Sequence, residues 1–218
     1  MLIENSASKV SDYQLDIKRN FRGTPFSPLM TKEAKLQVER KVVEVLGDLY
    51  GTYTQINKLS DADCDWMLKT IGIHPKIKNR EHDASGINDD WPVGRGVFIQ
   101  DKKDFLVFVN FEDHLRIVVL PDKTSDSDGL NQGIKRGIKL LQTFEKLGYA
   151  TDPYLGNLTV SPANLGTAMT MKCNLTLRGN PSAQVDNQLI QQLKLDQCIK
   201  YEREDDVTHT LVTQKTLA

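Results

Sequence analysis

Three of the ionisable side chains between Asn110 and Arg116 are of types that could take part in chemistry at a site: the carboxylate of Glu112, the imidazole of His114 and the guanidinium of Arg116. A carboxylate and a guanidinium four residues apart, at a turn and the start of a strand, can form an ion pair that holds the turn. A histidine in such a place is more often a hydrogen-bonded structural residue than a general base. We therefore favour structural roles for all three over binding of a ligand.

Two further segments combine turn-forming residues with polar side chains. The first, Asp90 to Gly96, reads DWPVGRG, and we expect Asp90 and Arg95 to tie this loop to the rest of the fold. The second, Ser161 to Thr167, reads SPANLGT, and its Gly166 suits a tight loop because glycine adopts conformations that other residues avoid.

The three segments, in this order and at these distances, closely resemble the DWPxARG, NEEDHLR and CPxNLGT signatures of the ATP:guanidino phosphotransferases. These are the phosphagen kinases, which include creatine kinase and arginine kinase. The resemblance is clear over residues 90–177 and weaker on either side. It implies an α+β fold, with an antiparallel β-sheet flanked by helices as in the guanidino-kinase and glutamine-synthetase type of catalytic domain.

The resemblance assigns the site residue by residue. Glu112 matches the carboxylate that orients the substrate guanidinium, a role that suits a bidentate acceptor, and Ser161 stands at the position of the reactive cysteine. Arg116 matches one of the arginines that hold the nucleotide. Thr170 stands where the family has another such arginine, and Asn174 where it has a histidine beside the base, so these two positions are losses.

Other cationic positions of the family are also missing. Another arginine falls near Cys198, and two in the N-terminal segment fall at Gln14 and Asp16, with Arg19 and Arg22 nearby. Hydrogen bonds to charged groups contribute roughly 1.5 to 3 kcal/mol each. Losing three or four of them would weaken binding of nucleotide or of the transition state by several orders of magnitude.

We therefore expect a catalytically impaired phosphagen-kinase-like protein that acts as a structural or interaction subunit of a cytoplasmic or cytoskeletal assembly, such as that of a cilium. The alternative is a divergent guanidino kinase, of arginine or creatine type, that uses Arg19, Arg22, Lys172 or a partner's arginine. A third hypothesis is a regulatory subunit that binds nucleotide weakly through Arg116 and Ser161. The first hypothesis implies no cofactor, and the second implies Mg-ATP.

Composition excludes several other classes of function. The chain has 218 residues, 39% of them hydrophobic and 26% charged, and a formal net charge of -1. No apolar run approaches the roughly 20 residues that cross a membrane, and the start of the chain lacks the pattern of a secretory signal. The near-neutral balance argues against nucleic acid as a partner. Three widely spaced cysteines predict neither a disulfide nor a zinc site.

The patterning predicts one domain over residues 1–218, with an extended N-terminal segment (1–30), a helical part (31–89) and a sheet core (90–218). Helices are expected over 31–50 (capped by Thr31), 60–72 (capped by Ser60), 128–148 and 185–193. Strands are expected over 96–100, 105–110, 115–120, 158–161 and 168–177, with weaker strands beyond, and residues 76–90 are expected to form a loop.

The resemblance also bears on partners. Members of the family normally carry a small helical domain before this one and continue well beyond the position of Thr210. If the fold is kept, a sheet edge or an apolar surface that relatives cover internally has to be covered in another way, because exposed strand edges invite pairing. We therefore expect a protein partner or self-association at an exposed sheet edge.

Overall fold

The computed structural model describes residues 9–121, 129–178, 197–204 and 207–213, with side chains described between Tyr13 and Lys172. The helix expected over 185–193 lies outside these residues. None of the described helices is long and apolar enough to cross a membrane.

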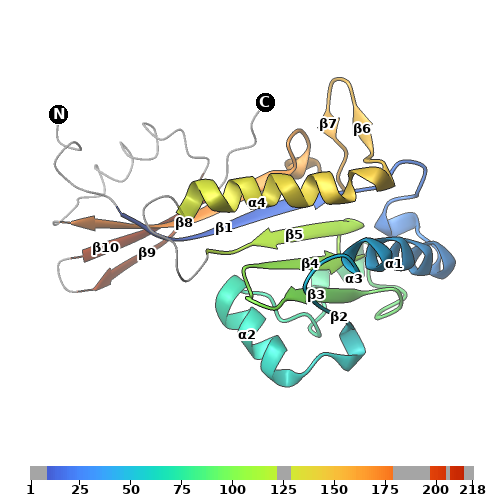
Figure 1. Cartoon of the computed structure of the whole chain (residues 1–218), viewed down its shortest axis with the longest axis horizontal. Helices are drawn as coiled ribbons and strands as arrows, with labels where there is room; N and C mark the ends of the chain where they lie inside the picture. The colour runs from blue at the N-terminus through green and yellow to red at the C-terminus, as the bar shows by residue number, and fades with distance from the viewer. Residues whose placement is uncertain (1–8, 122–128, 179–196, 205–206, 214–218) are drawn as a thin grey trace.

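An eight-stranded antiparallel sheet forms the centre of the molecule, in the order β2-β3-β4-β5-β1-β8-β10-β9 (Figure 1). Its strands are β1 (Lys9–Arg19), β2 (Gly51–Gln55), β3 (Gly96–Gln100), β4 (Phe105–Val109), β5 (Leu115–Val119), β8 (Met169–Arg178), β9 (Gln197–Glu204) and β10 (Val207–Thr213). The helices are α1 (Lys32–Leu46), α2 (Asp61–Ile71), α3 (Arg80–Ala84) and α4 (Gly129–Phe144). The expected α+β class, with helices flanking an antiparallel sheet, is confirmed.

The N-terminal strand β1 lies in the interior of the sheet, between β5 and β8 (Figure 1). Its register pairs Ile17 with Ile117 on one side and with Met169 on the other. The segment expected only to be extended therefore supplies a strand that joins the two halves of the sheet. Strand β2, which falls in the part expected to be helical, forms one outer edge.

The two faces of the sheet bury separate apolar clusters. Helices α1 and α4 cover one face, where Val42 and Phe144 pack against Leu15, Ile17 and their neighbours. Close packing of α4 depends on small residues, because a Cβ at Gly133 would overlap the ring of Tyr13, and the hydroxyl of Tyr13 donates a hydrogen bond to the Gly129 carbonyl (3.1 Å).

Helix α2 covers part of the opposite face. Its Cys64 and Met67, together with Leu59 just before it, pack against residues of β3, β4 and β5 such as Phe108 and Val118. Cys64 is a free, buried thiol.

The predicted helix ends are largely confirmed. The hydroxyl of Thr31 accepts a hydrogen bond from Ala34 N (3.2 Å), and that of Ser60 accepts one from Asp63 N (3.0 Å), so both act as N-caps. Gly72 ends α2 in the left-handed conformation, with φ of 72°. Helix α1 stops at Leu46, earlier than expected, because β2 begins at Gly51.

Two predictions for irregular regions are wrong. Residues 158–161 form no strand; the local pairing is instead a two-stranded hairpin of β6 (Thr151–Asp152) and β7 (Gly156–Asn157). The 76–90 segment is not entirely loop, because it contains α3. At 158–161 the backbone makes a hydrogen bond to a distant side chain, from Val160 N to Asp113 Oδ1 (2.8 Å), whereas the 76–90 segment is held by local bonds such as that from Asp83 N to the Asn79 carbonyl (3.1 Å).

Asn110 ties the turn after β4 to two other segments. Its backbone has φ of 56°, and its buried side-chain amide donates to the carbonyls of Lys35 (2.8 Å) and Gly94 (2.7 Å). One side chain thus holds α1, the loop before β3 and the start of the 110–116 motif together.

We predict that Asn110→Gly lowers the free energy of unfolding by about 2 to 4 kcal/mol, because it leaves two buried carbonyls without donors. Lys103→Gly is the matched control. Lys103 also has a positive φ (59°) but belongs to a surface turn, so its replacement should change stability by less than about 1 kcal/mol. Urea unfolding of both variants checks this, and equal effects would contradict the proposed role of the amide.

Candidate functional site

The alternation of side chains along β1 creates a polar row on the sheet. Leu15 and Ile17 point into the apolar cluster under α1 and α4, so Gln14, Asp16 and Lys18 point to the opposite face. Asp16 is 5% exposed and Gln14 is 8% exposed. Buried charges need partners, and the partners of this row come from β5 and the turn before it.

Arg116 of β5 forms a bidentate ion pair with Asp16. Its Nε lies 2.9 Å from Oδ1 and 3.0 Å from Oδ2 of the carboxylate, and its terminal Nη2 also donates to Oδ2. The guanidinium lies over the ring of Phe108, 5.7 Å from its centroid. Burial lowers the pKa of Arg116, but Asp16 outweighs burial and the net pKa is raised. Arg116 is therefore a cation whose charge is already matched.

Glu112 also has a partner on strand β1. Its carboxylate lies 3.6 Å from the ammonium group of Lys18. The expected ion pair between Glu112 and Arg116 is therefore wrong: each residue pairs with β1 instead. The reason is the register, which places Lys18 directly opposite Arg116 and brings Asp16 next to it.

Strand β8 supplies the other side of the polar row. Thr170 is the Cα partner of Asp16, and Lys172 is the partner of Gln14. Thr170 therefore stands close to the Asp16–Arg116 pair, as expected for a site position, and contributes no charge. Asn174 follows on the same strand, opposite Asp12, and its side chain lies outside the described set.

The loop that contains Ser161 is held beside the 110–116 motif by Asp113. Oδ1 of Asp113 accepts hydrogen bonds from Asn20 Nδ2 (2.6 Å) and Val160 N (2.8 Å), and burial raises the pKa of this carboxyl. The Ser161 carbonyl accepts from the hydroxyl of Thr159 (2.9 Å). The structure places Glu112 beside Lys18, Arg116 beside Asp16 and Thr170 opposite Asp16, and it holds the residue before Ser161 against Asp113. The roles assigned to these residues stay predictions.

An aromatic cluster borders the site. Phe111, at the first acidic position of the family motif, packs edge-on against Trp91 and Phe108, with ring centroids 5.9 and 5.0 Å away. Trp91 in turn stacks under the buried guanidinium of Arg95, which donates to the carbonyls of Ile87 and Val93. The Arg95 side chain therefore joins positions within its own loop rather than tying that loop to the sheet as predicted, and Phe111 packs in apolar surroundings at the position of an acid in the family motif.

Arg19 lies on the wrong face of the sheet to replace a missing site arginine. Its guanidinium is over the ring of Tyr149 (5.5 Å to the centroid) and donates to the carbonyls of Lys18 and Thr167. Burial lowers its pKa. Arg22 is exposed in the turn that follows β1. Of the three substitutes considered, only Lys172 shares the face of Arg116.

His114 is a fully buried structural residue, as predicted. Its Nδ1 accepts from the backbone N–H of Phe21 (3.0 Å), so the proton is on Nε2, which lies 2.9 Å from the carbonyl oxygen of Pro25. Burial lowers the pKa of His114 to about 4. The neutral imidazole fastens the end of β1 to the start of β5 and has no lone pair left for a substrate.

Two cations of this arrangement already have carboxylate partners. Phosphoryl transfer needs uncompensated cations around the triphosphate, whereas Arg116 and Lys18 pair with Asp16 and Glu112, and Lys172 is the further cation of this face. Within the described part of the chain no group of three or more histidine, cysteine or acidic side chains could hold a metal ion. A nucleotide phosphate approaching Arg116 would meet the carboxylate of Asp16.

The family resemblance places Asp16 at an arginine position but does not predict that it pairs with Arg116. It also gives no role to Lys18. A signal was present in the strict alternation YQLDIK, residues 13–18, which is typical of a strand with one polar face.

Comparison with known proteins gives the following matches. Residues 34–201 match the family described as ATP:guanido phosphotransferase, C-terminal catalytic domain. Arginine kinase of Limulus polyphemus is 36% identical over 166 residues, which cover 73% of this chain and 44% of the relative. Arginine kinase of Anthopleura japonica is 34% identical over 160 residues, 72% of this chain and 22% of the relative. The chain thus spans less than half the length of these relatives.

Solved structures agree with the sequence matches. The substrate-free duplicated taurocyamine kinase of Schistosoma mansoni superposes with a TM-score of 0.78 at 26% identity, covering 96% of this chain and 30% of that one.

The burial of His114 predicts a pH dependence of stability. The unfolded imidazole binds a proton at about pH 6.5 and the folded one only near pH 4, so the unfolded state binds more protons between these values. Stability should therefore fall as the pH drops through this window, by roughly 3 kcal/mol from this residue.

Urea unfolding at several pH values checks this. His114→Asn, which can still accept from Phe21 N, should lose this part of the slope even though it is less stable overall. His82→Asn removes an imidazole outside the buried network and should keep the wild-type slope. An unchanged slope in His114→Asn would refute the assignment.

Proposed function

This chain belongs to the ATP:guanido phosphotransferase family, in the region of its C-terminal catalytic domain, and we propose that it is a catalytically impaired member that serves as a structural or interaction domain. The observation that carries the proposal is the bidentate ion pair between Asp16 and Arg116. It turns the retained nucleotide-binding arginine into a cross-strand contact of the sheet. The setting we propose is a cytoplasmic or cytoskeletal assembly.

Separating Arg116 from Asp16 would cost free energy at the carboxylate as well as at the arginine. For Arg116 to bind a phosphate, it would have to leave Asp16, which is 5% exposed and would remain buried and unpaired. Breaking a buried pair in this way costs about 3 to 5 kcal/mol. Asp16 would also repel the incoming phosphate, so the site opposes the ligand that relatives bind.

The acceptor side of the site has the same character. Glu112 could still orient a guanidinium, but Lys18 lies 3.6 Å away and competes for the carboxylate. A guanidino substrate would have to displace an ammonium group that belongs to the chain itself. Glu112 is 26% exposed, so this pair is the weaker of the two and would yield first.

One observation favours the alternative of a divergent guanidino kinase. Lys18 and Lys172 lie on the same face as Arg116, beside Asp16 and Gln14, and could offer replacement charges to a triphosphate. In that case the wild-type chain would transfer phosphate from MgATP to arginine, creatine, taurocyamine or a peptide arginine. Complete absence of turnover with all four acceptors would exclude it.

We predict that the wild-type chain shows no saturable calorimetric binding of MgADP or MgATP up to millimolar concentration at low salt. Asp16→Asn combined with Thr170→Arg, which releases Arg116 and restores a second cation, should bind MgADP at least about tenfold more tightly, since each charged hydrogen bond contributes more than 1.4 kcal/mol.

The matched control is Asp104→Asn. Asp104 forms an ion pair with Arg136 at a distance of 3.3 Å, and this pair is not part of the polar row. The substitution therefore breaks a similar pair and should leave nucleotide binding unchanged. Micromolar binding by the wild type would overturn the proposal. Failure of the double variant to gain affinity, while remaining folded, would show that charge neutralisation is not what closes the site.

A further inference from the structure

Among the described strands, β2 has β3 as its one neighbour and forms an edge of the sheet. Ile56 N donates to the Arg95 carbonyl (3.1 Å), which fixes the phase of this antiparallel pair. Alternation then directs the backbone groups of Thr54 toward β3 and those of Tyr53 and Gln55 away from it. The outward groups of Tyr53 and Gln55 are available for pairing with another strand.

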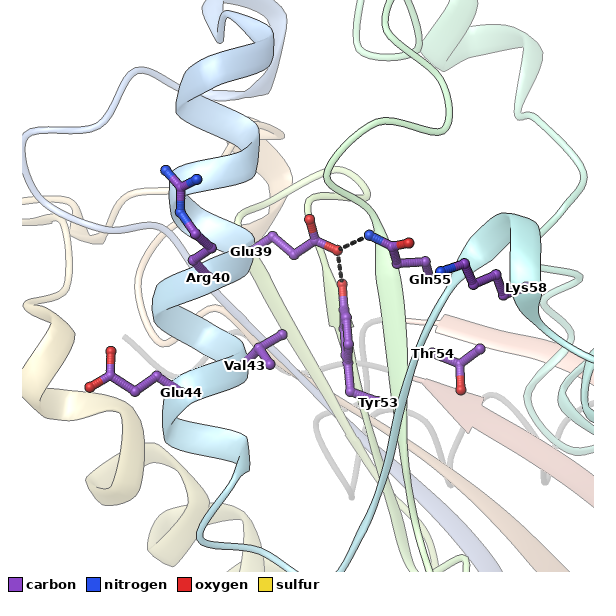
Figure 2. Close-up of a pocket in the computed structure, with 8 residues that line it drawn as sticks. All are labelled: Glu39, Arg40, Val43, Glu44, Tyr53, Thr54, Gln55 and Lys58. Atoms are coloured by element: carbon purple, nitrogen blue, oxygen red, sulfur yellow. Dashed lines mark hydrogen bonds between the residues drawn. The ribbon is translucent and has the colours of Figure 1, made fainter.

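A groove of about 670 Å³ runs between this edge and helix α1 (Figure 2). It is lined by both elements and by the turn after β2: Glu39, Arg40, Val43, Glu44, Tyr53, Thr54, Gln55 and Lys58. The groove therefore lies where the side chains of a strand added to β2 would point.

A buried carboxylate without a cationic partner faces this groove. Glu39 is 6% exposed, and its Oε1 accepts from the hydroxyl of Tyr53 (2.8 Å) and from Nε2 of Gln55 (3.2 Å). Burial, and then the bond to Glu39, raises the pKa of Tyr53, so the phenol stays a donor. No lysine or arginine of the described residues lies within 4 Å of this carboxylate.

The other charges of the groove stand at its rim. In Figure 2, Arg40 and Glu44 project from α1 away from the Glu39–Tyr53 contact, and Lys58 lies beyond Gln55. Two neutral donors compensate a buried carboxylate less completely than a cation does. A guanidinium or ammonium group is therefore the chemical group that this groove favours.

We propose that the groove is a docking site for an extended segment of a partner polypeptide, which adds a strand to β2 and places an arginine or lysine side chain against Glu39. Strand addition uses main-chain hydrogen bonds for affinity and side-chain pockets for specificity. Here both features meet in the same residues: Tyr53 and Gln55 hold Glu39 with their side chains and direct their backbone groups outward.

The groove is separate from the polar row of the candidate site. Tyr53 packs against the cluster under α1 and α4, whereas Arg116 lies over Phe108, which belongs to the cluster under α2. The two lie on opposite faces of the sheet. The docking site rests on the proposed interaction role and gives that role a place in the molecule. Failure of the groove to bind a peptide would leave the ion pair between Asp16 and Arg116, and what is proposed from it, unaffected.

The first test uses the peptide acetyl-Thr-Val-Arg-Val-Thr-amide, with citrulline in place of its arginine as the uncharged isostere. Binding to the full chain is measured by calorimetry, and the contacted residues by amide NMR shifts. We expect saturable binding with shifts on β2 and α1. Replacing arginine by citrulline, or Glu39 by Gln (E39Q), should each weaken binding about tenfold, and both together little more than either alone.

The second test concerns the strand edge. Gln55 has φ of -62°, which proline adopts, so Gln55→Pro removes the outward N–H without forcing the backbone. Gln55→Ala is the matched control because it removes the same side chain and keeps the N–H. We expect Gln55→Pro to bind the arginine peptide at least about fivefold more weakly than Gln55→Ala, since one backbone hydrogen bond contributes roughly 1 kcal/mol.

Three results would overturn the proposal. One is no binding of the arginine peptide at millimolar concentration. Another is binding of free agmatine as tightly as the peptide, which would make the groove a small-molecule site. The third is a dimer, detected by sedimentation without peptide, that Gln55→Pro dissociates and Gln55→Ala does not, because a second copy would then be the occupant.

Discussion

The bidentate contact between Asp16 and Arg116 joins two strands that lie 100 positions apart in the chain. Strand β1 sits between β5 and β8, so the halves of the sheet meet along it. On one face it contributes apolar side chains such as Ile17 to the core under α1 and α4. On the other face it must accommodate a nearly buried carboxylate, and Arg116 makes that possible. Removing Arg116 would leave the carboxylate of Asp16 unpaired in a place that water barely reaches.

The same contact determines what the site can bind. In an ATP:guanido phosphotransferase the reaction depends on positive charge arranged around a triphosphate, and the protein must keep that charge available. Here the scaffold of the site survives in Asn110, Asp113 and His114, whose buried hydrogen bonds hold β1, β5 and the intervening loops in register. The charges of Arg116 and Lys18, in contrast, are each paired with a carboxylate of the chain. The hydrogen-bonded scaffold of a site can therefore be present while two of its cations are engaged within the chain.

The sequence allowed prediction of those elements that depend on local chemistry. Thr31 and Ser60 cap their helices, and Gly72 ends one, because each acts through groups within a few residues. The strands around the 110–116 motif were recognisable as apolar runs. The segment 158–161 was not, because its backbone bonds to Asp113 rather than to a neighbouring strand.

Site geometry was harder to predict than site composition. The motifs predicted Glu112, Arg116, Ser161 and Thr170 as site positions, and the register of β8 places Thr170 opposite Asp16. The ion pairs could not be predicted from the motifs, because they depend on which strand lies beside β5. A pairing of Glu112 with Arg116 is the natural expectation from spacing along the chain, but the register of β1 offers each of them a nearer partner. Pairing between strands distant in sequence is set by the whole sheet.

Two carboxylates of similar burial show how one physical rule yields different outcomes. Asp16 and Glu39 are 5% and 6% exposed, and both accept hydrogen bonds at the sheet. Asp16 meets a guanidinium of its own chain, which is the basis for proposing that this surface disfavours an anionic ligand. Among the described residues, Glu39 meets the neutral donors of Tyr53 and Gln55, beside a strand that pairs with β3 on one side. Since a buried charge is most stable beside its opposite, the same rule underlies both proposals: an ion pair complete within the chain at the centre of the sheet, and a cationic strand added at β2.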